Sequence, residues 1–86
     1  MEKSQEPSLA ELEQMARGRE VLYEIRPMGN VVRIAAIDGV TGLEAVVVGA
    51  RMLSMFSMKA NARRKLLRLL HRHGQIGARI DPWAGL

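Results

Sequence analysis

Four basic residues near the C-terminal end of the chain have the spacing of one helix face: Arg64, Lys65, Arg68 and Arg72. Clustered Lys and Arg side chains bind phosphates, and a three-stranded sheet with one packed helix recurs among DNA-binding modules. These residues are therefore candidate nucleic-acid ligands. The alternative is an ordinary solvated helix face, where cations in the last turns interact favourably with the helix dipole.

The other polar residues offer little catalytic or metal-binding chemistry. The chain has no cysteine, which excludes disulfides, thiolate nucleophiles and cysteine metal sites. His71 and His73 are two residues apart on a predicted helix, so their side chains point in different directions. Asp38 lies in a predicted turn, where an aspartate most often bonds its own backbone. We therefore predict a protein that is not an enzyme and that has no metal site and no cofactor.

A second set of candidate residues is apolar and would serve self-association. Apolar side chains cover close to half the circumference of the predicted C-terminal helix, which is more than a three-stranded sheet can bury. The excess must meet the N-terminal helix, the C-terminal tail or a second copy, so we expect a homodimer. Methionines in this set can also simply fill gaps in a core. The candidates for a partner or self-association surface are Met52, Met55, Phe56, Leu66, Leu70 and Trp83.

The middle of the chain has the alternating pattern of β-strands. Residues 20–26 and 31–37 have alternate apolar positions, and residues 43–48 are β-branched at positions 46, 47 and 48. Gly29-Asn30 suits a tight hairpin turn, and residues 38–42 carry turn chemistry. The pattern predicts a three-stranded antiparallel meander. Pro27 cannot donate to a ladder, so the first strand is expected at an edge.

Helical patterns flank the meander. Ser8 and Glu11 have the spacing of a capping box, which predicts a short N-terminal helix. Residues 52–73 have the apolar period of a helix that ends at Gly74. Lys59 and Arg63 fall within its apolar arc, where their stems can snorkel or a carboxylate can approach them. Together the patterns predict an α+β fold, with the long amphipathic helix packed on one sheet face.

The expected organisation is a disordered lead-in over residues 1–7, one small domain over 8–74, and an irregular tail over 75–86. The tail contains Trp83, which either anchors it on the sheet or forms a handle for a partner. No run of about 18 apolar residues and no signal-peptide pattern is present, so we expect a cytoplasmic protein without a transmembrane segment.

Charge is unevenly distributed along the 86 residues. Up to residue 24 there are three basic and six acidic residues, and the rest of the chain holds ten basic and three acidic ones. This pattern is compatible with a polyanionic partner or with an acidic arm that folds over a basic body. A basic amphipathic helix also resembles a membrane-surface element, although here its apolar side is needed to cover the sheet.

Several short runs carry a family resemblance: residues 20–26, Gly29-Asn30 with Val32-Arg33, and residues 36–38 with Thr41-Gly42 and Glu44. They resemble a family of small uncharacterised alphaproteobacterial proteins that pair such a meander with a C-terminal helix. The resemblance covers about residues 20–49, and the helix by pattern alone. It implies the fold and a bacterial cytoplasmic setting. Because the family has no assigned activity, no functional residue is carried over.

The biochemical role is not specified by these residues. Our leading hypothesis is a small non-enzymatic interaction module that self-associates through its sheet or through the apolar arc of the helix. The alternative is a basic nucleic-acid-binding module that uses the polar face of that helix. No small-molecule substrate is evident.

Overall fold

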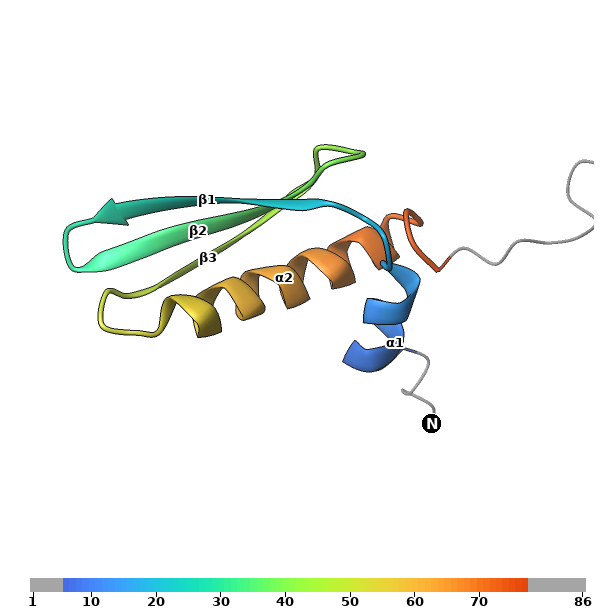
Figure 1. Cartoon of the computed structure of the whole chain (residues 1–86), viewed down its shortest axis with the longest axis horizontal. Coiled ribbons are helices and arrows are strands. Elements are labelled where there is room, and N and C mark those ends of the chain that lie inside the picture. Colours follow the sequence, from blue (N-terminus) through green and yellow to red (C-terminus); the bar gives the residue numbers. More distant parts are fainter. Residues whose placement is uncertain (1–5, 78–86) are drawn as a thin grey trace, which may run out of the picture.

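The computed structural model of the chain describes residues 6–77. It shows a three-stranded antiparallel sheet with one helix along one face and a short helix beside the end of the long one (Figure 1). The predicted α+β fold is therefore confirmed. The elements in chain order are α1 (Leu9–Met15), β1 (Val21–Met28), β2 (Val31–Asp38), β3 (Glu44–Ala50) and α2 (Met55–Arg72).

The sheet has the strand order β1-β2-β3, so β1 and β3 are its edges. Gly29, at φ 65°, makes the hairpin turn that sets the register of β1 on β2. The register runs from Met28 opposite Val31 to Val21 opposite Asp38. Pro27 lies within β1, opposite Val32, and an edge strand tolerates it because one side of its backbone needs no ladder partner.

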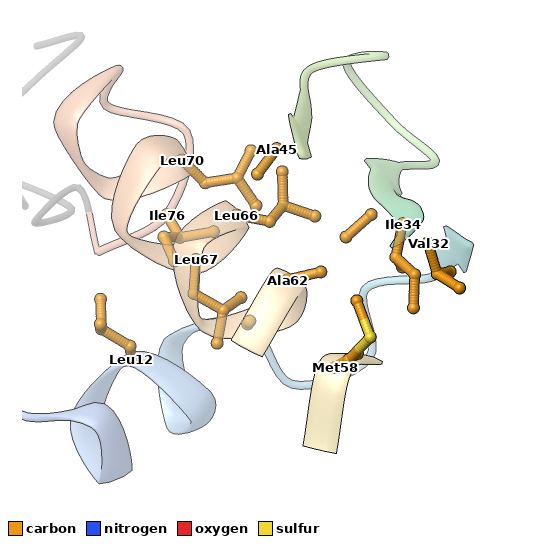
Figure 2. Close-up of a cluster of buried hydrophobic side chains, with 12 residues drawn as sticks. Leu12, Val32, Ile34, Ala45, Met58, Ala62, Leu66, Leu67, Leu70 and Ile76 are labelled. Carbon is orange, nitrogen blue, oxygen red and sulfur yellow. The ribbon is translucent and has the colours of Figure 1, made fainter. Parts of the chain in front are cut away.

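The hydrophobic core lies between the sheet and α2 (Figure 2). β2 contributes the alternate residues Val32, Ile34 and Ala36, which all face the helix. α2 packs against β2 and β3, whereas β1 extends beyond its cover and leaves Ile25 exposed. The buried α2 residues are Met58, Ala62, Leu66, Leu67 and Leu70.

α1 closes one end of this core. Its capping box is present as predicted, with Ser8 and Glu11 each bonded to the other's backbone N–H. Leu12 is fully buried against the C-terminal half of α2. Seven residues are too few for a stable isolated helix, so this packing is what holds α1 in place.

The core also includes Ile76, two residues beyond the predicted domain end at Gly74. Gly74, at φ 70°, reverses the chain after α2 and returns Ile76 to the core. Trp83 and residues 1–5 of the predicted lead-in lie outside the described residues.

α2 begins at Met55, three residues later than the apolar period predicts. The Ser54 side chain accepts a hydrogen bond from the Ser57 N–H and caps the helix. Residues 51–53 instead form a turn, since the Arg51 N–H bonds the Asn30 carbonyl and the Leu53 N–H bonds Ala50. Met52 therefore lies outside the helix.

The two cations in the apolar arc of α2 both have partners within the chain. Lys59 Nζ lies 5.4 Å from the centre of the Tyr23 ring, a cation–π contact. Arg63 donates two hydrogen bonds of 2.8 Å to the carboxylate of Glu13 in α1. Of the two alternatives, an approaching carboxylate thus applies to Arg63, and it comes from α1 of the same chain.

Candidate functional site

The sheet face that points away from α2 is a first candidate surface, here called the open sheet face. Side chains alternate between the two faces of a sheet, so the residues next to the core residues of β2, and the residues paired with them, lie on this face. No described element covers it, as Figure 1 shows. Its residues are Leu22, Glu24, Arg26 and Met28 of β1, Val31, Arg33, Ala35 and Ile37 of β2, and Glu44, Val46, Val48 and Ala50 of β3.

Most side chains on the open sheet face are apolar. Val48 is 59% exposed, and Leu22 and Met28 are each 49% exposed. Ala35, at the centre, is fully buried although it does not belong to the core between sheet and helix; the larger side chains around it shield it from solvent. An apolar surface of this extent, here interspersed with four charged residues, is typical of interaction sites.

The charges on the open sheet face are two arginines and two glutamates. Arg26 of β1 lies directly opposite Arg33 of β2, and like charges in such a pair repel. Arg33 reaches along β2 to Glu44, with 3.9 Å between Nη2 and Oε2. Glu24 makes no ion pair among the described residues. The face is therefore electrically neutral but incompletely paired.

A groove between α2 and the outer edge of β3 is the second candidate surface, here called the basic groove. It has a volume of about 360 Å³. Lys65, Arg68 and Arg72 line it, so the structure brings together three of the four predicted basic residues. Arg64 lies outside the groove and bonds Asn61 through a 2.7 Å hydrogen bond. The rest of the lining is Leu69 of α2 and Glu44, Ala45 and Val46 of β3.

Two of the groove's cations have contacts within the chain. Lys65 Nζ donates a 2.8 Å hydrogen bond to the Val46 carbonyl on the free edge of β3. Arg68 donates a long bond of 3.5 Å to the Pro7 carbonyl and lies 3.9 Å from the Glu6 carboxylate. The Arg68 contacts are long, and the shorter Lys65 bond is exposed to solvent, so the groove keeps positive charge that a partner can reach.

The predicted apolar candidates separate into two groups. Leu66 and Leu70 are fully buried in the protein's own core. Met52 is 91% and Phe56 81% exposed, at the end of the molecule where β3 leads into α2, and Met55 is partly exposed beside them. The apolar arc of α2 is therefore mostly used within the chain.

Among the described residues, Asp38 is the charged residue that is buried. Its carboxylate accepts two hydrogen bonds from Arg19, of 2.8 and 3.2 Å, and two from the backbone and hydroxyl of Thr41. Burial opposes its ionisation, but the bonds from Arg19 and Thr41 outweigh this and lower the pKa of Asp38 from 3.8 to about 2. Its predicted backbone-capping role is confirmed.

The ion pair of Asp38 with Arg19 was not predicted from the sequence. The signal for it is the hairpin at Gly29-Asn30, whose register brings the start of β1 beside Asp38. Every oxygen of this carboxylate is engaged in holding the β2–β3 turn and the start of β1 together, so its role is structural. The Glu13 carboxyl has a similar role, and its hydrogen bond with Arg63 lowers its pKa.

The two histidines lie near the end of α2 and do not form a metal site with other described residues. His71 is partly buried and His73 is exposed at the C-cap of α2. Within residues 6–77, no three His, Asp or Glu side chains gather closely enough to hold a metal ion. In the same part of the chain, no helix is long and apolar enough to span a membrane.

The fold and these surfaces define a small α+β domain with an uncovered sheet face and a basic groove at a sheet edge. Residues 18–73 match the family described as Domain of unknown function (DUF6898). Because the match covers well over half the chain, the chain belongs to this family. No curated protein and no solved structure shows a significant match. The family match begins after α1 and spans the meander and α2.

Proposed function

We propose that the protein is a non-enzymatic interaction module that self-associates through its open sheet face, placing two sheets face to face. The supporting observation is the exposure of Leu22, Met28 and Val48 on one continuous, uncovered face. α2 already covers the other face, so a second layer on this side would complete a layered arrangement. The proposal includes a bacterial cytoplasmic setting, with which a cysteine-free chain agrees.

The charges on the open sheet face favour a second copy of the chain as its partner. A two-fold interface puts the same patch on both sides, so it must be self-complementary. Two arginines and two glutamates meet this condition. In such a dimer the adjacent Arg26 and Arg33 of one copy can face Glu24 and Glu44 of the other. This pairing would relieve the repulsion between the two arginines.

The size of the face predicts a weak dimer. Strands are about 4.8 Å apart and rise about 3.3 Å per residue, so three strands of seven or eight residues present a face of roughly 14 by 26 Å. This is small beside a standard interface, in which each partner buries about 800 Å². We therefore expect a dimer that forms over micromolar concentrations and dissociates on dilution.

The two alternatives have less support. The exposed apolar end consists of Met52, Leu53, Met55 and Phe56; residues 50–60 contain basic but no acidic side chains, so it lacks the self-complementary charges of the open sheet face. Nucleic-acid binding by the basic face would use all four predicted cations, whereas Arg64 lies outside the groove that brings Lys65, Arg68 and Arg72 together. Both alternatives stay hypotheses.

Static light scattering coupled to size exclusion, over protein concentrations from about 5 to 500 µM, tests the proposal. Val48→Glu puts a charge on the open sheet face and should give a monomer throughout. Val40→Glu is the matched control, because Val40 is 73% exposed in the β2–β3 turn; this variant should dimerise like the wild type. A monomeric wild type at every concentration would refute self-association. Loss of the dimer in Phe56→Glu alone would move the interface to the apolar end.

A further inference from the structure

The free edge of β3 and the basic groove beside it form one continuous surface. Antiparallel pairing alternates between residues that bond the neighbouring strand and residues whose N–H and C=O groups point the other way. The Asp38 N–H bonds the Leu43 carbonyl, so residue 43 faces β2. Residues 44, 46 and 48 then point outward, and the bond from Lys65 to the Val46 carbonyl agrees with this.

No described strand pairs with this edge. An exposed edge is a template for another strand, and natural proteins often protect it with a charged side chain, most often lysine. Lys65 occupies one outward carbonyl in this way. Its long side chain is exposed and held by a single hydrogen bond, so a strand that offers several backbone bonds can displace it.

The α2 side of the basic groove, which faces this edge, favours a negatively charged partner. Lys65, Arg68 and Arg72 lie three to four residues apart on α2 and line the groove together. The acidic groups near them are Glu44 in the lining and Glu6 at 3.9 Å from Arg68. The groove therefore has a net positive charge. Leu69 adds an apolar surface between the cations.

We propose that β3 and the basic groove bind an acidic peptide segment of another protein, in extended conformation, as a fourth strand of the sheet. The backbone of the segment pairs with the outward groups of residues 44–48. Alternate side chains of a strand lie on one face about 6.8 Å apart, so carboxylates at every second position reach the three cations. The three cations lie on α2, on the side of the sheet opposite the open sheet face, although Glu44 and Val46 contribute to both surfaces; the peptide can therefore bind the monomer or the dimer.

The geometry favours a peptide over nucleic acid. A strand edge offers alternating donors and acceptors, which an extended peptide matches and which phosphates, having only acceptors, cannot match. Arg64 is the test of this difference, because it lies on the same helix but outside the groove. Phosphate binding to the whole basic face would use Arg64, and strand addition would not.

Fluorescence anisotropy with the full chain tests the proposal. The probe is a labelled eight-residue peptide of alternating glutamate and valine. Its controls are the lysine–valine peptide and the same glutamate–valine peptide with alternate backbone nitrogens methylated, which keeps the charge but blocks pairing. We expect binding of the unmodified acidic peptide, weakened by salt, and at least about tenfold weaker binding of both controls. Equal binding of the methylated peptide would refute strand addition.

Two matched variants locate the site. Arg72→Glu should weaken binding of the acidic peptide about tenfold, whereas Arg64→Glu, with the same charge change, should alter it less than about twofold. Circular dichroism confirms that each variant is folded. Binding should persist in Leu22→Glu, which puts a charge on the open sheet face at the opposite edge strand β1, and this separates the proposal from self-association. Labelled duplex DNA that binds more tightly than the peptide, and that both arginine variants weaken equally, would overturn the peptide assignment in favour of nucleic acid.

Discussion

At the residue scale, Asp38 is the polar group on which the fold depends most. Its side chain is fully buried, and its partners Arg19 and Thr41 belong to different segments. Replacing one member of a buried charged pair leaves the other without a partner. Asp38→Asn should therefore destabilise the protein by about 2–4 kcal/mol. Urea unfolding at pH 7 measures this, with the exposed Glu20→Gln as control, which should change stability by less than about 0.5 kcal/mol.

The same carboxylate predicts a pH dependence. Because the pKa of Asp38 is lowered to about 2 in the folded protein, the folded state binds fewer protons than the unfolded state in acid. The stabilisation is complete above the unfolded pKa and is lost as the pH falls from about 4 towards 2, by about 2 kcal/mol. The stability difference between wild type and Asp38→Asn should shrink accordingly between pH 5 and pH 2. A difference that stays constant over this range would contradict the role of Asp38.

Sequence patterns predicted hydrogen bonds between residues close together in the chain and missed those between residues far apart in it. The capping bonds of Ser8 and Asp38 join residues three apart, so spacing alone reveals them. The bonds from Arg19 to Asp38 and from Arg63 to Glu13 join residues 19 and 50 apart. They depend on strand register and on where α1 packs, which residue types do not specify.

At the element scale, α1 is held by one buried leucine and one ion pair. Leu12 is fully buried, whereas Leu9 on the same helix is 37% exposed. Leu12→Ala should cost about 2–4 kcal/mol through the cavity it leaves, and Leu9→Ala less than about 1 kcal/mol. In Leu12→Ala, hydrogen exchange should show faster exchange in α1 than in β2. Equal protection of α1 in both variants would mean that Leu12 does not hold the helix.

The number, type and order of the elements followed from the sequence, while their ends did not. β1 continues through Pro27 to Met28, because an edge strand needs no N–H at that position. α2 begins at Met55 because the backbone bonds of residues 51 and 53 form a turn. The apolar pattern continues through this turn, so periodicity alone left the start of the helix open.

At the scale of the whole molecule, the apolar surface of the helix and that of the sheet have different roles. The sequence suggested that the wide apolar arc of α2 leaves a surface for a partner. The structure buries Leu66 and Leu70 of that arc within the domain, on the side of α2 that faces Ala45 of β3 (Figure 2). The uncovered apolar surface lies on the opposite side of the sheet, where strand patterns alternate less clearly because apolar residues occupy both faces.

The central claim is that two copies associate through the open sheet face, and exchange of its charges tests this most directly. One variant carries Arg26→Glu and Arg33→Glu, and a second carries Glu24→Arg and Glu44→Arg. Like charges then oppose each other in each homodimer, whereas the mixed pair is complementary. Loss of the exposed Arg33–Glu44 pair costs about 0–1 kcal/mol, so both variants should fold.

Sedimentation equilibrium of these two variants, alone and in equimolar mixture, gives the decisive result. We predict that each variant alone is a monomer at concentrations where the wild type dimerises, and that the mixture restores a 1:1 dimer. If both variants dimerise alone as well as the wild type does, or if the mixture stays monomeric, the open sheet face is not the interface.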